Sequence, residues 1–256
     1  MKKILIGCLA LLLCATIQAQ PQKVIKFASE ATYPPFEFVQ PSGELAGFDI
    51  DIARAICAKA ELTCTFSNQP WESLIPALRL GKFDAVISSM DITDERKKQV
   101  DFSESYFSPS GSFVTHKDAK FSPTLAGLKG KTVGVQKGTT FEKYLGQPQY
   151  KDVIKLKTYT NFQGVTMDLK AGRSDIILAD TPIVEDWLKN SDESKNFIMV
   201  GDPIHDPKIL GVGFGIALKK GNTELLEKIN QGLAEIKKDG TYQKIFQQYF
   251  PHTKLD

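Results

Sequence analysis

Three charged side chains stand where the sequence could build a binding site. Asp91 and Asp180 each follow a short apolar run that predicts a buried strand, and Arg96 comes five residues after Asp91. In open α/β sheets, ligands bind beyond the carboxyl ends of the strands. Two carboxylates at such ends can bind one small cationic group, although either alone also suits a helix N-cap. The Arg96 guanidinium can hold a carboxylate through two parallel hydrogen bonds, or it can pair with Asp94.

The segment Gly138-Thr139-Thr140 stands between an expected strand and an expected helix. Free backbone N–H groups and the helix dipole at such a turn favour an anion. Simple capping of the helix by threonine is the alternative, and it is compatible with anion binding.

Two aromatic residues, Tyr33 and Trp71, lie beside polar turns. Such residues often belong to the core, but flat rings on either side of an alkyl stem or guanidinium would contribute about 0.5–2 kcal/mol. Glu30 ends the first expected strand, where it can receive the far end of a cationic ligand or cap the following turn.

One sequence pattern occurs twice, 91 residues apart, at 78–87 and 169–178. Both copies read Leu-x-x-Gly-(Lys/Arg)-x-Asp followed by three apolar residues. This pattern predicts a helix that ends at the glycine and then a strand buried in a parallel sheet. It indicates a protein of two matched halves, unless the repeat is a coincidence of a common αβ unit.

The remaining patterns complete an α/β protein with two lobes. We expect strands at 24–29, 83–88, 111–116, 132–135 and 213–218, and helices opening near 48, 71, 93 and 141, through 184–188, and at 223–238 and 241–249. The first lobe is then discontinuous, comprising 20–110 and 212–256. The second lobe comprises 111–211, with a hinge segment at each of its ends.

The first 19 residues are typical of a signal peptide. Lys2 and Lys3 precede an apolar stretch, and Ile17-Gln18-Ala19 is a small-residue cleavage site. We expect cleavage near Ala19 and a free periplasmic protein. Without the leader the chain has about equal numbers of acidic and basic residues, which does not indicate a nucleic-acid or acidic-membrane partner.

Two cysteines remain after removal of the leader, Cys57 and Cys64. In an exported protein a local disulfide is the favoured interpretation. A zinc site is the weaker alternative, because His116, His205 and His252 are scattered without ligand spacing.

Motifs along the whole mature chain match one family in order. They are the segments 24–36, 47–51, 73–76, 91–96 and 239–242. The chain resembles the periplasmic polar-amino-acid-binding proteins of ABC importers, solute-binding protein family 3, and is most similar to the arginine-binding branch. The resemblance implies a type II periplasmic-binding-protein fold, in which each lobe is a mixed sheet flanked by helices and two crossover strands join the lobes. It also supports the Cys57–Cys64 disulfide.

The resemblance implies a role for each candidate residue around an amino acid. Arg96, helped by Thr140 and a backbone N–H near Asp91, would take the α-carboxylate. Asp180 and the carbonyl group of Ser89 would take the α-ammonium.

The other implied roles concern the ligand side chain. Tyr33 and Trp71 would sandwich it, Glu30 would meet its far end, and Ser88 would line the same pocket. Glu30 and Asp91 depart from the lysine/arginine/ornithine branch, which carries Asp and Ser at these positions.

Charge decides which amino acid we expect. The expected pocket contains one base, Arg96, and three acids, Glu30, Asp91 and Asp180. This excess of negative charge favours a cationic ligand and excludes glutamate. A planar guanidinium suits ring stacking best. The predicted protein therefore captures L-arginine and delivers it to an inner-membrane ABC permease and its ATPase.

This predicted binding protein acts as a monomer, without cofactor or metal and without catalysis. The alternatives are a broader set of ligands (lysine, ornithine and histidine), a sensor, or a dehydratase-type enzyme on the same fold.

Overall fold

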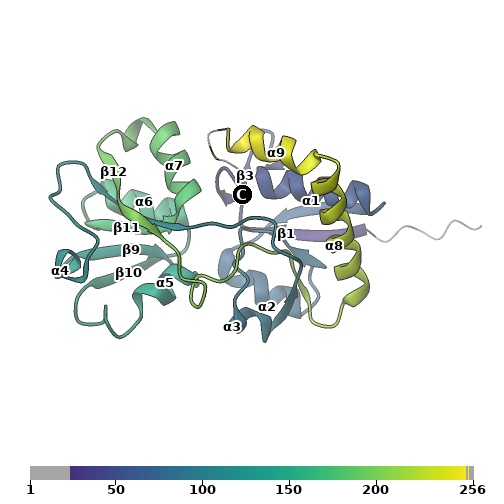
Figure 1. Cartoon of the computed structure of the whole chain (residues 1–256), viewed down its shortest axis with the longest axis horizontal. Coiled ribbons are helices and arrows are strands. Elements are labelled where there is room, and N and C mark those ends of the chain that lie inside the picture. The colour runs from purple at the N-terminus through teal and green to yellow at the C-terminus, as the bar shows by residue number, and fades with distance from the viewer. Residues whose placement is uncertain (1–23, 252, 254–256) are drawn as a thin grey trace, which may run out of the picture.

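The structure is a computed structural model that describes residues 24–251 and 253. Two five-stranded sheets, each flanked by helices, form two lobes that lie side by side along the long axis (Figure 1). The predicted signal peptide lies outside the described residues. Among the helices within residues 24–251, none has the length and apolar character that crossing a membrane requires.

The sheet of the first lobe has the strand order β5-β1-β6-β13-β7. The strand β1 is parallel to β5 and β6, and β13 is antiparallel to β6 and β7. These strands are β1 (Val24–Ser29), β5 (Thr63–Asn68), β6 (Ala85–Val86), β7 (Val100–Phe102) and β13 (Ala217–Lys219). A small antiparallel sheet of β2 (Thr32–Tyr33), β3 (Glu37–Val39) and β4 (Leu45–Ala46) adjoins them.

The helices of the first lobe come from both ends of the chain. They are α1 (Phe48–Lys59), η1 (Trp71–Ser73), α2 (Leu74–Arg79), α3 (Asp94–Lys97), α8 (Thr223–Lys238) and α9 (Thr241–Tyr249). Helix α1 forms where the sequence predicts it because Phe48, Ile52 and Ile56 recur every four residues and are fully buried. The C-terminal helices α8 and α9 pack against α1 (Figure 1).

The sheet of the second lobe has the order β10-β9-β11-β8-β12. Strands β10, β9 and β11 are parallel to one another, and β8 is antiparallel to both of its neighbours, β11 and β12. Its strands are β8 (Gly111–His116), β9 (Thr132–Gln136), β10 (Lys155–Tyr159), β11 (Ile176–Asp180) and β12 (Phe197–Ile204). Its helices are α4 (Leu125–Leu128), α5 (Thr140–Leu145), α6 (Phe162–Lys170), α7 (Thr181–Asn190) and η2 (Asp192–Ser194).

The repeated sequence pattern occupies equivalent places in the two sheets. Gly81 ends the turn after α2 with φ +71°, and Gly172 ends the turn after α6 with φ +67°. Each is followed by a buried strand, β6 or β11, that runs parallel to its neighbour. The prediction of two matched halves is confirmed.

Several predicted elements differ in extent. The predicted helix 71–80 begins as the 3₁₀ turn η1, and the predicted strand 83–88 pairs with β1 only at Ala85 and Val86. Beyond them the chain turns, since Ser89 has φ +45° and cannot continue a strand. Strand β12 extends through Ile204, and β13 is shorter than the predicted strand 213–218.

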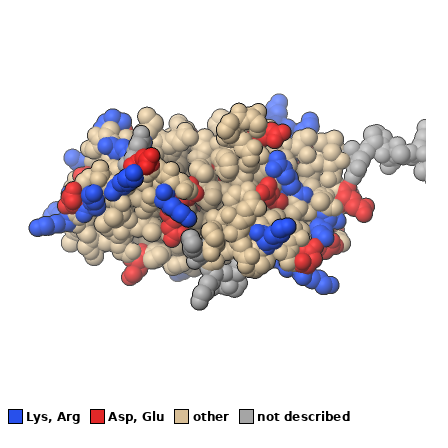
Figure 2. Space-filling model, turned by 90° about the horizontal axis from the view of Figure 1, so that it is seen from above, with Lys and Arg blue, Asp and Glu red and all other residues tan. Residues whose placement is uncertain are grey.

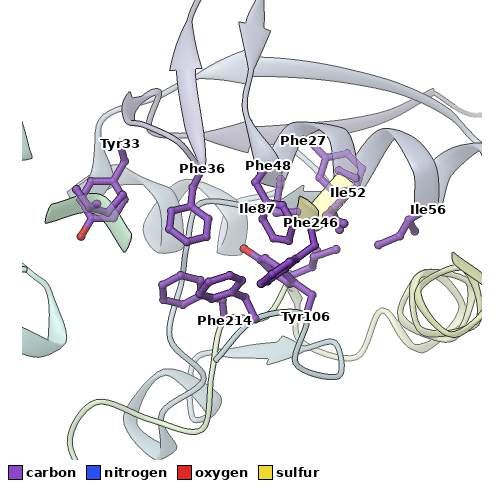
Figure 3. Packing of buried hydrophobic residues seen from close by; sticks show 14 of the residues in the cluster. Phe27, Tyr33, Phe36, Phe48, Ile52, Ile56, Ile87, Tyr106, Phe214 and Phe246 are labelled. Carbon is purple, nitrogen blue, oxygen red and sulfur yellow. The ribbon is translucent and has the colours of Figure 1, made fainter. Parts of the chain in front are cut away.

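The two segments that cross between the lobes pair with each other. Phe107 and Phe214 form an antiparallel bridge, and the Phe214 N–H donates to the Phe107 carbonyl at 2.7 Å. Both rings pack against Phe36, with centroids 4.9 and 5.4 Å away. Figure 3 shows Phe214 beside Phe36. The crossover is thus anchored in the aromatic core of the first lobe.

The predicted local disulfide is confirmed. Cys57 of α1 bonds to Cys64 of β5, closing a loop with a sequence separation of 7. The bond ties the end of the helix to the edge strand of the first sheet.

We expect the variant Cys57→Ala/Cys64→Ala to lose about 2–3 kcal/mol of unfolding free energy, because an open loop of this length gains conformational entropy in the unfolded state. Urea unfolding followed by circular dichroism measures the loss. A reductant should destabilise the wild type by a similar amount and leave the variant unchanged. Equal midpoints for oxidised wild type and variant would contradict the prediction.

Candidate ligand-binding site

A polar pocket lies between the two lobes. Its walls include eight of the nine residues predicted to bind ligand: Glu30, Tyr33, Trp71, Ser88, Ser89, Asp91, Thr140 and Asp180. Glu37, Gln136, Thr139 and Phe141 also line it. Thr139 belongs to the turn expected to favour an anion, whereas the other three were not predicted.

The ninth predicted residue, Arg96, contacts the wall of this pocket. Its guanidinium donates to the Asp91 carbonyl at 3.0 Å and to the Gly138 carbonyl at 3.3 Å, and lies 3.7 Å from the Asp91 carboxylate. It also stacks 5.2 Å above the Trp71 ring. Arg96 is held in place because α3 starts as predicted, with Thr93 accepting a hydrogen bond from the Arg96 N–H. A fixed guanidinium is well suited to binding an anion.

Strand ends explain why residues distant in sequence meet here. Glu30 follows β1 and Asp91 follows β6 in the first lobe, while Gln136 and Asp180 end β9 and β11 in the second. All four strands belong to parallel pairs, so their carboxyl ends meet at one edge of each sheet. The two edges face each other across the pocket.

Polar contacts join the two lobes across the pocket. The Tyr33 hydroxyl donates to Asp180 at 2.7 Å, and the Thr140 hydroxyl donates to Asp91 at 2.8 Å. Figure 3 shows Tyr33 at the edge of the hydrophobic cluster, on the side toward the second lobe. These contacts define a closed arrangement, because each needs both lobes.

A further polar contact joins the two lobes at Glu30. The Gln136 amide donates to the Glu30 carboxylate at 3.1 Å, and Thr32 donates to the same carboxylate at 2.5 Å. Gln136 satisfies the criterion that identified Asp91, a polar residue just after an apolar run, so the sequence held a signal for it. Glu37 had none, since it stands alone between Phe36 and Phe38.

Exposed ion pairs lie on the rim near α5. Lys137 pairs with Glu72 at 2.9 Å and Lys143 pairs with Glu95 at 2.5 Å. Each joins a residue of the second lobe to one of the first. Elsewhere acidic and basic side chains are intermixed over the face seen in Figure 2.

Negative charge exceeds positive charge in the pocket. Glu30, Glu37, Asp91 and Asp180 are each less than 8% exposed, and Arg96 is the only buried basic side chain within residues 24–251 and 253. Burial raises the pKa of Asp180 well above its usual value, and the charge of Asp91 raises it further. Burial likewise raises the pKa of Glu30. Excess carboxylates whose pKa values are raised favour a ligand that brings positive charge.

Two lobes closing on a polar pocket with one fixed guanidinium and several carboxylates define a binding protein for a small charged molecule. Residues 25–252 match the bacterial extracellular solute-binding proteins, family 3, and the chain belongs to that family. The predicted resemblance is confirmed.

Named relatives support the same assignment. The ABC transporter arginine-binding protein 1 of Escherichia coli K12 is 45% identical, covering 98% of this chain and 100% of the relative. The histidine-binding periplasmic protein of Salmonella typhimurium LT2 is 36% identical, over 92% and 90%. A solved Salmonella typhimurium periplasmic binding protein described as highly specific for arginine has a TM-score of 0.82 and 38% identity, over 89% and 99%. The predicted type II fold with two lobes is confirmed.

The buried carboxyls predict how stability depends on pH. Burial raises the pKa of Asp91 to about 6 and that of Asp49 to about 7, whereas an unfolded chain titrates these groups near ~3.9. The folded protein therefore binds more protons in this window, and the free energy of unfolding should increase as the pH falls from about 7 to about 5. The slope is up to ~1.4 kcal/mol per pH unit for each group.

Urea unfolding of the wild type and Asp91→Asn across this range tests the expectation, with a smaller slope for the variant. Asp168 acts in the opposite direction, because hydrogen bonds from Lys157 and Tyr159 lower its pKa to about 2. Its contribution to the free energy of unfolding is lost only at lower pH. Identical slopes for the two proteins would exclude a role for Asp91.

Proposed function

We propose that this protein captures L-arginine between its two lobes and delivers it to an ABC importer in the inner membrane. The observation that carries the proposal is the charge of the pocket, in which the buried carboxyl groups of Glu30, Asp91 and Asp180 accompany the single guanidinium of Arg96. An amino acid with a cationic side chain adds positive charge where it is deficient. The arginine-binding relatives support the same ligand.

The proposed orientation of the ligand follows from the placement of donors and acceptors. Arg96 and Thr140 bind the α-carboxylate, while Asp180 and the Ser89 carbonyl bind the α-ammonium. The ligand side chain extends between Tyr33 and Trp71.

The far end of the ligand then meets Glu30, and Ser88 lines the pocket beside it. A planar guanidinium can accept both ring stacking and bidentate pairing with the Glu30 carboxylate. A ligand that contacts both lobes stabilises the closed arrangement, since only that arrangement provides every contact.

Further features belong to this proposal. The mature protein works as a periplasmic monomer after cleavage near Ala19, it contacts a permease coupled to an ATPase, and it performs no catalysis. The lobes comprise 20–110 with 212–256, and 111–211. An acid or base for catalysis would have to stay free in the complex, whereas each pocket carboxyl here has a partner in the protein or the ligand.

A broader cationic ligand set is the second candidate, supported by the histidine-binding relative. Lysine and ornithine would satisfy the charge of the pocket but lack a planar group for stacking, whereas histidine has a planar ring that is charged only when protonated.

Isothermal titration calorimetry tests the ligand. We expect one tight site for L-arginine, weaker binding of lysine, ornithine and histidine, and no binding of L-glutamate, because a further anion would face uncompensated carboxylates. A thermal-shift screen of the twenty amino acids gives an independent ranking. Equal heats for arginine and glutamine would contradict the charge argument.

A second prediction concerns Glu30. The variant Glu30→Gln should bind arginine at least about tenfold more weakly, because the guanidinium loses a charged partner. Its affinity for glutamine should change little. The exposed Glu44→Gln on the same lobe is the matched control and should bind arginine like the wild type. Equal losses for both ligands would show that Glu30 shapes the pocket rather than recognising charge.

A further inference from the structure

Two buried carboxyl side chains contact Ser88 and Ser89 in the wall of the pocket. Glu37 comes from β3 and is 1% exposed, and Asp49 comes from the first turn of α1 and is fully buried. Asp49 does not line the pocket, and the arginine-binding proposal assigns no role to either residue.

Both carboxyls bind the same short turn. The Ser89 N–H donates to Asp49 at 2.7 Å, and the Ser89 hydroxyl donates to Glu37 at 3.1 Å. The Ser88 hydroxyl donates to the other oxygen of Glu37 at 3.1 Å and itself accepts from the Glu30 N–H at 2.9 Å. A continuous chain of hydrogen bonds therefore leads from the buried acids to the backbone at the far end of the pocket.

The turn requires this support because Ser89 has φ +45°. A residue other than glycine is strained in the left-handed region, and such strain persists only where the surroundings hold it. Two carboxyls accept hydrogen bonds from Ser89, one from its N–H and one from its hydroxyl. These bonds keep Ser89 in the strained conformation. Ser89 is thereby fixed on the pocket wall, where its carbonyl group is proposed to meet the ligand ammonium.

The two acids have no cation beside them. Within the described part of the chain, no ion pair involves Glu37 or Asp49. Their titratable neighbours are Glu30 and the phenols of Tyr106 and Tyr242, of which Tyr106 donates to Asp49 at 2.7 Å. Two buried carboxyls in contact cannot both ionise without a cation.

One oxygen of the acid pair lacks a donor. The Asp49 Oδ1 atom is enclosed, and among the described residues no N–H, serine, threonine or tyrosine hydroxyl donates to it. The Glu37 carboxyl is in hydrogen-bonding contact with Asp49. Burial and the charge of Asp49 raise the pKa of Glu37 well above its usual value, whereas the hydrogen bonds that Asp49 accepts from the Ser89 N–H and the Tyr106 hydroxyl favour its ionised form. A protonated Glu37 supplies the donor that Asp49 otherwise lacks.

We propose that Glu37 is protonated at neutral pH and donates to Asp49, and that this acid pair is a positioning device that holds Ser88 and Ser89 in their ligand-binding conformation. The pair then carries one negative charge instead of two. The positioning role rests on the proposed binding of arginine, whereas the shared proton is a property of the protein alone.

Infrared spectroscopy tests the proton without any ligand. The wild-type spectrum minus that of Glu37→Gln at neutral pH should contain the carbonyl band of a protonated carboxylic acid. The matched control Glu44→Gln removes an exposed carboxylate from the loop between β3 and β4, so its difference spectrum should contain only carboxylate bands. If the Glu37 difference spectrum contains only carboxylate bands, Glu37 is ionised and the proposal is overturned.

Two variants at position 37 test positioning. Glu37→Gln keeps a neutral hydrogen-bonding side chain of the same shape and should bind arginine within about threefold of the wild type. Glu37→Leu leaves the two serine hydroxyls without their acceptor and should bind at least about tenfold more weakly. A crystal structure of Glu37→Leu should show Ser89 outside the left-handed region, which tests positioning without ligand.

The outcomes separate this proposal from the proposed function. A wild type that shows the acid band but no heat with arginine would contradict the arginine assignment and leave the acid pair intact. Wild-type affinity and an unchanged Ser89 in Glu37→Leu would overturn the positioning role. A large loss of affinity in Glu37→Gln, matching that in Glu37→Leu, would show that an ionised Glu37 is needed.

Discussion

The imbalance of buried charge between the lobes is the constraint on which the rest of this structure depends. Carboxyl groups on both sheet edges converge on one pocket, and a single guanidinium offsets them. Burial makes each uncompensated charge costly, so protein groups cover part of it: Tyr33 binds Asp180, Thr140 binds Asp91, and Gln136 binds Glu30. A cationic ligand completes the compensation, which links the choice of ligand to closure of the lobes.

A few rigid elements position these side chains. Four strands end at the pocket, and the two crossover segments pair with each other and anchor in the aromatic cluster around Phe36. The crossover segments thus connect two lobes that each supply part of the pocket wall. The turn at Ser89 is strained by about 1–3 kcal/mol, and its hydrogen bonds to the two buried acids offset this cost.

Local sequence patterns were sufficient to predict much of the fold and of the binding site. The duplicated pattern predicted two matched lobes, the four-residue spacing in 48–56 predicted α1, and polar residues after apolar runs located Asp91 and Asp180. Gln136 obeys the same rule and was overlooked. Glu37 was beyond such reasoning, because nothing about an acid between two phenylalanines indicates that it will be buried against a second acid.

The sequence by itself determined which side chains end the strands and hence the excess of acid over base at the sheet edges, because those features depend on neighbouring residues in the chain. Only the tertiary structure decided which of those side chains meet. The packing of two lobes brought Tyr33 to Asp180 across 147 positions and enclosed Asp49 beside Glu37. Protonation also belongs to the tertiary level, because a carboxyl keeps its ordinary pKa until folding removes it from water and sets another charge beside it.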